Sequence, residues 1–358
     1  MPLTLPEHFP RELITHQSWR RVVLCWCLVL LGVVVLNSLC YGLLRWKPIN
    51  KTSAVVSHKW QLLENCKPDM DLLILGDSSG NQGVDPDVLR GQLGVDSLNL
   101  CTIGGGLLLD DRMMLEDYLL KHPAPRAVLL VHVYDIWPRR INRSVLSLFP
   151  YAMSELQQRL GTYQLSLWDW LYVWSYRYMP IYHQNVSLKK MLYQPMKYFK
   201  HQWEFNTTGY EAKTGRSYSG WKRDVQAHMS IARHRKIVGV NKINVANLKI
   251  MTQLAQEHDF ELFLVMAPIA SELYREKEFR QYYDQIPTAL GVYAKQNDKV
   301  HLLFKEPFRA TSKHMQSADH VTVNAARHYT KLLANRIRWV FQEPQSPKPV
   351  NLEPIRNP

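Results

Sequence analysis

The stretch LLILGDSSGNQGVDPDVL, residues 72–89, decides the fold. Its four apolar residues run into Gly76-Asp77-Ser78, and a polar turn with further glycines follows. A short apolar run that ends at a glycine is typical of a buried strand. In an open α/β sheet, ligands bind just beyond the carboxyl ends of the strands. Ser78 therefore lies where a nucleophile is expected, although a plain turn serine after a capping Asp77 is the alternative interpretation.

Apolar runs of the same kind recur along the chain, and stretches with helical spacing separate them. One of these stretches begins with Asp85 as a candidate N-cap and Pro86 at the first helical position. The apolar runs are continuous and do not alternate with polar residues, which suits a parallel sheet covered on both faces. The pattern predicts a doubly wound α/β fold with a parallel sheet of about five strands. The predicted strands are 71–76, 96–101, 126–134, 261–268 and 300–304.

The segment Val22–Leu44 carries no charged residue, and aromatic residues lie towards its ends. At about 1.5 Å per residue it is long enough to cross a hydrocarbon core of ~30 Å. A buried core helix and a cleaved signal peptide are the alternatives. We expect one N-terminal transmembrane helix. Basic residues flank both of its ends, so the positive-inside rule alone does not orient it.

The section 137–240 interrupts the alternation of strands and helices, and we expect it to be a helical insertion between the third and fourth strands. It contains an aromatic run at 163–182 and a basic run at 189–236. Packing within the protein is the simpler interpretation of the aromatic run, and a substrate or membrane platform is the alternative. The basic run fits a solvated or membrane-facing surface better than a specific polymer site.

These features predict the organisation of the whole chain. It comprises a short tail (1–21), a transmembrane anchor (22–44), a linker and a helix that leads into the domain (45–70), an α/β domain (71–342) carrying the insertion 137–240, and a Pro-rich tail (343–358).

The formal net charge of +13 invites a nucleic-acid interpretation, but the anchor and the lack of a recognised binding motif argue against it. Anionic lipids or an acidic polymer are better partners for such a charge. Only Cys66 and Cys101 lie outside the anchor, and a disulfide between them is conceivable. No cysteine and histidine spacing typical of zinc is present, so we expect neither a metal nor a cofactor.

Three segments resemble the SGNH (GDSL-like) hydrolase superfamily. Gly76-Asp77-Ser78 resembles its nucleophile block, the 104–106 glycine loop its second block, and His320 before a closing helix its final block. The segments GDSSGNQGVDP and DHVTVNAARHYTKLLA resemble those of a membrane-anchored branch of the superfamily. That branch accompanies membrane-bound O-acyltransferases and includes relatives of the D-alanyl-lipoteichoic-acid transfer protein. The resemblance covers about 71–135 and 245–338, and it implies a flavodoxin-like, SGNH-type sheet.

The resemblance implies acyl-transfer chemistry. Ser78 would be the nucleophile and His320 the base that removes its proton. The N–H groups of Ser78 and of Gly104 or Gly105 would stabilise the oxyanion. Asn81 either lines the pocket or builds the turn.

Two positions depart from the superfamily pattern. Tyr134 stands where an oxyanion-hole Asn is usual, and Ser317 stands where the triad acid is usual, three residues before the histidine. Asp319 is adjacent to His320, so we expect its side chain to point elsewhere. The acid is therefore Asp319, Asp135, another carboxylate, or absent.

Two functions follow from these expectations. The first is an extracytoplasmic serine O-acyltransferase or esterase that moves an acyl group, most simply acetyl, to or from a cell-envelope polysaccharide. It would face the periplasm or cell exterior beside a membrane-bound O-acyltransferase. The second is a non-catalytic accessory protein of the same fold that binds this acyltransferase or the glycan.

Overall fold

The computed structural model describes residues 16–48, 50–161, 163–196, 206–212, 218–234 and 239–342. The predicted tail 343–358, most of the predicted tail 1–21, and parts of the basic run (197–205, 213–217 and 235–238) lie outside the described residues.

A five-stranded parallel sheet forms the centre of the globular part, with the strand order β2-β1-β3-β4-β6. Its strands are β1 (Leu72–Gly76), β2 (Ser97–Asn99), β3 (Ala127–His132), β4 (Glu261–Met266) and β6 (Val300–Leu302). Each lies within a strand that the sequence predicts, and β1 and β3 are buried throughout. The predicted doubly wound, flavodoxin-like α/β fold is confirmed, because the chain order of the strands reverses direction beside β1.

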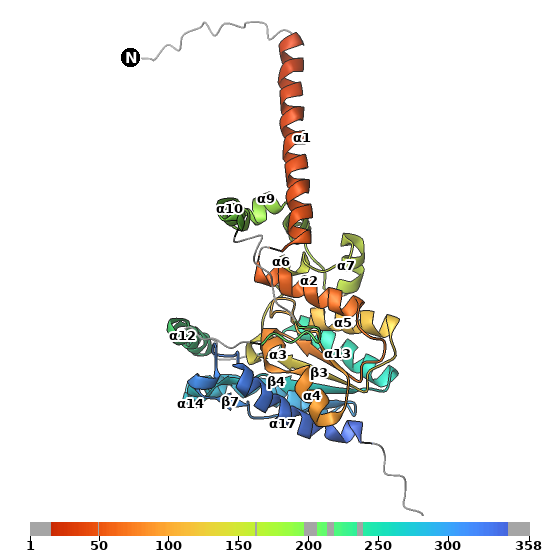
Figure 1. Cartoon of the computed structure of the whole chain (residues 1–358), viewed down its shortest axis with the longest axis vertical. Coiled ribbons are helices and arrows are strands. Elements are labelled where there is room, and N and C mark those ends of the chain that lie inside the picture. Colours follow the sequence, from red (N-terminus) through yellow and green to blue (C-terminus); the bar gives the residue numbers. More distant parts are fainter. Residues whose placement is uncertain are drawn as a thin grey trace, which may run out of the picture.

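Helices cover both faces of this sheet (Figure 1). On one face α5 (Leu107–Lys121) packs against α13 (Lys242–Glu257), and on the other α4 (Pro86–Leu93) packs against α17 (Val323–Phe341). A further helix, α16 (Gln285–Lys295), packs against β6. The predicted start of α4 is confirmed, since the Asp85 side chain accepts a hydrogen bond from Asp87 N–H at 3.0 Å and Pro86 is the first helical residue.

The helix α1 (His16–Trp46) extends away from the globular part, which hangs from its C-terminal end (Figure 1). Within the described residues, Trp19–Trp46 is the span that is long and apolar enough to cross a membrane, with a mean hydropathy of 2.6. The predicted anchor 22–44 lies inside it. The next helix, α2 (Lys51–Glu64), begins after Asn50, whose side chain accepts from Ser53 N–H at 2.7 Å.

The insertion between β3 and β4 is helical in its described parts. Its helices are η1 (Tyr134–Ile136), α6 (Arg143–Leu146), α7 (Met153–Leu160), α8 (Leu167–Tyr178), α9 (Pro180–His183), α10 (Asn185–Tyr193) and α12 (Tyr218–His234). Val173 is the buried residue of α8, whereas Trp168 is 77% exposed. Tyr163 and Trp170 of the aromatic run pack against the hydrophobic core, so the packing interpretation fits these two residues but not Trp168.

Some elements give no clear signal in the sequence. A small parallel pair, β5 (Ile269–Ala270) and β7 (Arg309–Ala310), lies near α14 (Ser271–Arg275) and α15 (Lys277–Tyr283), and η2 (Ser312–His314) follows β7. Cys66 and Cys101 are both free thiols, so the conceivable disulfide does not form.

Candidate active site

The candidate nucleophile Ser78 is the first residue of α3 (Ser78–Gly83), immediately beyond the carboxyl end of β1. Gly76 has φ +145, and a Cβ atom there would lie 1.9 Å from the Val131 carbonyl oxygen. Only glycine lets β1 leave the sheet so close to β3. Asp77 then caps α3 by accepting a hydrogen bond from Ser79 N–H at 2.7 Å. These two residues place Ser78 at the carboxyl edge of the sheet.

The structure brings Ser78, His320 and Asp319 together in a chain of contacts. Ser78 Oγ lies 2.9 Å from His320 Nε2, and His320 Nδ1 lies 2.7 Å from Asp319 Oδ1. The His320 and Asp319 side chains keep exposed fractions of 21% and 14%, so solvent-side access to the site remains. A hydroxyl, an imidazole and an orienting carboxylate in this order form the arrangement that activates a serine nucleophile.

The expectation that Asp319 points away from His320 is wrong, because the chain folds back at this point. The N–H groups of Gln316 and Ser317 donate to the His320 carbonyl at 2.7 and 3.4 Å. The Ser317 hydroxyl lies 2.8 Å from Asp319 Oδ1 and 2.6 Å from His320 Nδ1. This tight turn directs the carboxylate of Asp319 to its neighbour. The alternative acid, Asp135, instead forms an ion pair with Arg139.

The two titrating members of the chain stabilise each other's charged forms. Burial alone would lower the pKa of His320, but the charge and hydrogen bond of Asp319 raise it above its ordinary value. Burial alone would raise the pKa of Asp319, but His320, His228 and the Ser317 hydroxyl hold it well below its usual range. Asp319 is therefore ionised at neutral pH and supports an imidazolium on His320.

Under the predicted serine esterase chemistry, substitution of Asp319 by Asn is expected to lower kcat for ester hydrolysis by about 10²-fold. A wrong histidine tautomer can cost ~10⁴-fold in a serine triad, but here Ser317 also contacts Nδ1 and retains part of the orientation. Loss of the carboxylate should also move the acidic limb of the pH profile to lower pH, because Asp319 raises the pKa of the base His320. Steady-state kinetics across pH measure both effects.

The matched control for this substitution is Ser317→Ala, which removes the hydroxyl but leaves the carboxylate. We expect it to leave the acidic limb near its wild-type position. An Asp319→Asn variant with wild-type kcat and an unmoved limb would exclude Asp319 as the orienting acid.

The predicted oxyanion loop begins beside the candidate nucleophile Ser78 and then packs against the insertion. Thr102 N–H donates to the Gly76 carbonyl at 2.8 Å, so the segment before the loop is fixed to the end of β1. A Cβ atom on Gly104 would lie 2.5 Å from Ile136 Cδ1, and one on Gly105 2.6 Å from Val145 Cγ2. Both glycines thus allow close packing on the insertion. Their roles as oxyanion donors stay a prediction.

Tyr134 and Asn81 make contacts that the sequence does not indicate. The buried Tyr134 hydroxyl lies 2.6 Å from His228 Nδ1 on α12, and its ring packs against Phe279 and Tyr283. Asn81 is buried, and its amide donates to Glu211 Oε2 at 3.1 Å. Asn81 therefore ties α3 to the insertion, and the Tyr134 hydroxyl is already engaged by a histidine.

A buried ionic network surrounds Asp77, the residue next to the candidate nucleophile Ser78, and sequence reasoning missed it. His132 at the end of β3 is 3.3 Å from Asp77 Oδ2 through Nδ1 and 2.7 Å from Asp111 Oδ2 through Nε2. Val133 N–H also donates to Asp77 Oδ2 at 2.8 Å. Burial opposes a charge on His132, but the carboxylates of Asp111 and Asp77 raise its pKa to about 9. The network fixes the residue that caps the nucleophile's helix.

Arg139 is a second residue that the sequence does not single out. Its guanidinium pairs with Asp135 and lies 3.5 Å from the Gly104 carbonyl oxygen. Burial alone would lower its pKa, but Asp135, with smaller contributions from Asp77 and Asp319, raises it. With 42% of its side chain exposed, Arg139 supplies a positive charge at the glycine loop.

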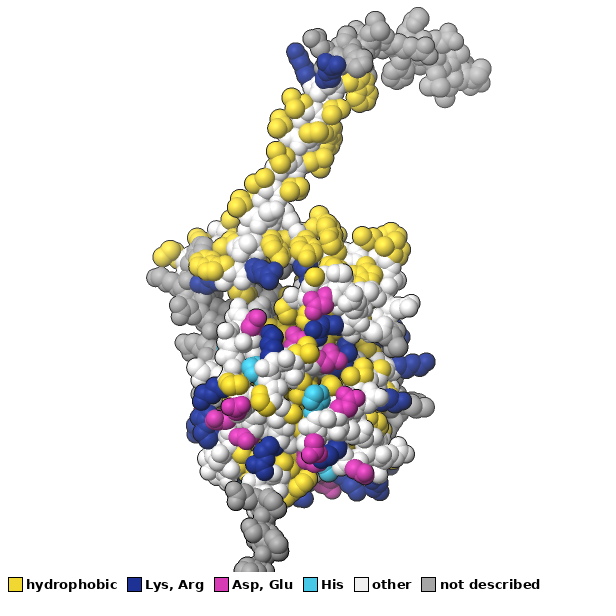
Figure 2. Space-filling model, turned by 90° about the vertical axis from the view of Figure 1, so that its right-hand side faces the viewer, with side chains coloured by type: hydrophobic (Ala, Val, Ile, Leu, Met, Phe, Trp, Pro, Cys, Tyr) yellow, Lys and Arg dark blue, Asp and Glu magenta, His cyan; other side chains and the backbone are white. Residues whose placement is uncertain are grey.

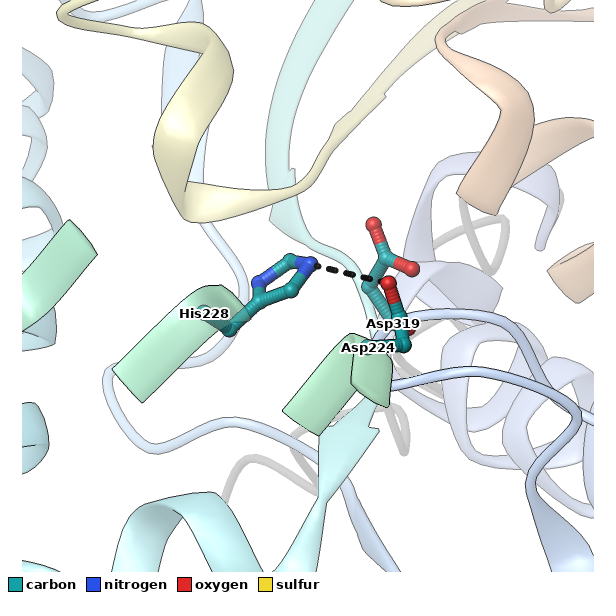
Figure 3. A group of neighbouring side chains, drawn as sticks. All are labelled: Asp224, His228 and Asp319. Atoms are coloured by element: carbon teal, nitrogen blue, oxygen red, sulfur yellow. Dashed lines mark ion pairs between the residues drawn. The ribbon is translucent and has the colours of Figure 1, made fainter. Parts of the chain in front are cut away.

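The helix α12 brings two more titratable side chains to the site (Figure 3). Asp224 accepts a hydrogen bond from Ala318 N–H at 2.5 Å, and His228 Nε2 lies 3.9 Å from Asp224 Oδ1. Asp224, His228 and Asp319 each place a ligand atom within 4.8 Å of the others, a geometry that could hold a metal ion. Because Asp319 also contacts His320, a cation there would compete with the imidazole for this carboxylate. Only the spatial proximity of α12 reveals this group.

Comparisons with known proteins leave the family open. No protein-family model matches the chain, and no curated protein matches it. One similar solved structure is described as "a putative platelet activating factor from Streptococcus pneumonia". It is 11% identical, and the alignment covers 82% of this chain and 93% of that chain with a TM-score of 0.34. So distant a similarity carries no argument about function, and the chemistry rests on the geometry of the site.

Proposed function

We propose that this chain is an extracytoplasmic serine esterase or O-acyltransferase, related to SGNH hydrolases, that moves an acyl group to or from a cell-envelope polysaccharide. One observation carries the proposal: the contacts from Ser78 Oγ to His320 Nε2 at 2.9 Å and from His320 Nδ1 to Asp319 Oδ1 at 2.7 Å. These contacts place a serine hydroxyl, a base and an acid in this order just beyond the carboxyl end of β1.

The proposed reaction has two steps. In the first, Ser78 Oγ attacks the carbonyl carbon of an acyl donor while His320 Nε2 takes the hydroxyl proton. The leaving group departs with that proton, and Ser78 keeps the acyl group as an ester. In the second, a sugar hydroxyl or water attacks this ester, His320 again takes and returns the proton, and Ser78 is released. Asp319 stabilises the imidazolium that forms in each step.

The donor and acceptor follow from the setting of the site. A helix long and apolar enough to cross a membrane suits a partner in the same membrane, and we propose a membrane-bound O-acyltransferase that delivers the acyl group. The net charge of +13 and the exposed Arg139 suit an anionic glycan or polymer as the acceptor.

An accessory role without turnover is the second candidate. It is favoured by Tyr134, because the hydroxyl that would replace the usual oxyanion amide already contacts His228 at 2.6 Å. In that case the same fold would bind the acyltransferase or the glycan and leave Ser78 unacylated.

Trapping of the acyl-enzyme distinguishes the two candidates. The full chain in detergent is incubated with p-nitrophenyl acetate, quenched in acid and mapped by mass spectrometry. Turnover predicts an acetyl adduct on the peptide that contains Ser78, and hydroxylamine should release it. Ser79→Ala is the matched control, since this neighbouring serine is buried with no hydrogen-bond partner for its hydroxyl among the described residues. An adduct that is absent from the wild type, or that persists in Ser78→Ala, would support the accessory role.

The proposed orientation predicts the behaviour of a reporter at the C-terminus. Alkaline phosphatase, which is active only outside the cytoplasm, should be active when fused after Pro358, whereas a cytoplasmic reporter fused there should not. The physical reason is that acceptor glycans of the envelope lie outside. An inactive alkaline phosphatase together with an active cytoplasmic reporter would exclude the extracytoplasmic location. That result would not bear on the proposed roles of Ser78, His320 and Asp319.

A further inference from the structure

The helices α8, α9 and α10 of the insertion expose large apolar side chains on the side of the molecule that carries α1. We call this surface the platform and define it by Trp168, Trp174, Tyr182, Val186, Leu192 and Tyr193. Tyr193 is 83% exposed and Leu192 is 72% exposed, although both are large and mostly apolar. Figure 2 shows hydrophobic side chains gathered where the globular part meets α1. A cluster of this kind on a protein surface marks an interaction site.

The platform is attached directly to α1. Asn37 of α1 donates its side-chain amide to the Tyr178 carbonyl and accepts from Ile181 N–H at 3.5 Å. The rings of Tyr41 and Tyr178 lie 5.8 Å apart. Figure 1 shows α9 and α10 beside the C-terminal part of α1, above the rest of the globular part. The insertion therefore lies alongside the last turns of α1, from Trp46 back to Asn37.

The length of α1 sets the level at which the platform lies. A hydrocarbon core of ~30 Å takes about twenty residues at about 1.5 Å each. Counted from Arg21, the last charged residue before the apolar span, twenty residues end at Tyr41. Asn37 thus falls within the core and Tyr41 at its boundary. Tyr178 contacts both of these residues and Ile181 contacts Asn37, so the insertion meets α1 at the end of its apolar span.

The composition of α10 also fits a bilayer surface. Lys189 and Lys190 are exposed on a short helix whose other exposed side chains are Asn185 at its first position and the apolar or aromatic Val186, Leu192 and Tyr193. The two lysines share the exposed face of α10 with its exposed apolar side chains, so their long side chains can reach lipid headgroups while the apolar side chains enter the boundary below. Tyrosine and tryptophan favour the same depth.

We propose that α8, α9 and α10 rest on the lipid bilayer that α1 crosses, with the platform side chains in the headgroup and acyl boundary and Lys189 and Lys190 against anionic headgroups. The occupant of the surface is lipid, because the platform continues from a helix that lipid itself surrounds. The inference does not depend on the proposed catalysis at Ser78.

Photocrosslinking in vesicles of defined lipids tests this inference. The full chain with p-benzoylphenylalanine in place of Tyr193 is reconstituted into vesicles of phosphatidylethanolamine and phosphatidylglycerol, irradiated and analysed by mass spectrometry. We expect phospholipid adducts on the peptide that carries position 193. The matched control has the same group in place of Trp339, an exposed aromatic residue on α17, where we expect at least tenfold less adduct. Equal yields at the two positions would overturn the inference.

Two further experiments test whether lipid is what contacts the platform and whether Lys189 and Lys190 contact anionic headgroups. In native membranes, a crosslink from position 193 to a protein in place of lipid would overturn the assignment to lipid. In the mixed vesicles, the double variant Lys189→Gln and Lys190→Gln should reduce the ratio of phosphatidylglycerol to phosphatidylethanolamine adducts severalfold, since each basic residue attracts anionic lipid. An unchanged ratio would overturn the headgroup contact.

Discussion

Ser78→Ala and His320→Ala are each expected to lower the hydrolysis of p-nitrophenyl acetate by at least about 10³-fold. The reason is the 2.9 Å contact between Ser78 Oγ and His320 Nε2, which makes the two side chains one nucleophilic unit. Members of such a unit act together, so removing one costs about as much as removing both. The double variant should therefore be no slower than either single variant, within error.

Initial rates of the full chain in detergent measure this effect, with circular dichroism to verify folding. Ser79→Ala and His258→Ala serve as controls, because Ser79 adjoins the nucleophile and His258 is an exposed histidine outside the site. Both controls should keep the wild-type rate. Equal rates in all six proteins, the wild type included, would exclude a Ser–His esterase and favour the accessory role.

The second large effect concerns stability: His132→Ala is expected to lower the free energy of unfolding by about 3–5 kcal/mol. His132 lies between Asp77 and Asp111, and all three side chains are at most 3% exposed. Removing the imidazole leaves two buried carboxylates without their cation. Burial raises the pKa of Asp111. Burial also opposes the charge on Asp77, but His132 and the N–H donors lower the pKa of Asp77 below its ordinary value. Denaturant unfolding followed by tryptophan fluorescence measures the loss.

The pH dependence of this stability separates the ionic contribution from simple loss of packing. In the folded protein the pKa of His132 is raised to about 9 from an ordinary 6.5. A raised pKa stabilises the fold fully below about pH 6.5, and the contribution is lost as pH rises through about 9. The difference in free energy of unfolding between wild type and His132→Ala should therefore decrease as pH rises from about 6.5 to about 9. A difference that stays constant would mean that His132 acts by packing alone. His258→Ala should have the same free energy of unfolding as the wild type at each pH.

The sequence predicted the sheet well because its signals are local. Each predicted strand contains an observed one, since continuous apolar runs such as 126–134 are what a strand buried on both faces requires. The start of α4 followed from Asp85 and Pro86, which act on their own helix. The pair β5 and β7 was missed, because two-residue strands carry no periodicity.

The candidate site was predictable only where a motif adjoins a strand end. Ser78 follows β1 directly, and His320 precedes the closing helix, so topology indicated that they meet. The direction of Asp319 depends on a turn closed by hydrogen bonds to the His320 carbonyl, which adjacency in sequence does not reveal. Asp224 and His228 reach the site through the fold of the insertion, nearly a hundred residues before Asp319 in the case of Asp224. No local pattern carries such a contact.

The contacts between α1 and the insertion restrict how the domain that carries Ser78 can move relative to α1. A domain on a flexible tether sweeps out a volume above the membrane and searches for its acceptor. Here Asn37 and Tyr41 of α1 contact Tyr178 of the insertion. Just after α1 ends, Lys51 forms an ion pair with Glu211 at 2.8 Å. These contacts fix the position of Ser78 relative to α1. Under the proposed function, the acyl donor would have to reach Ser78 at that fixed position, and a long glycan would have to move past it.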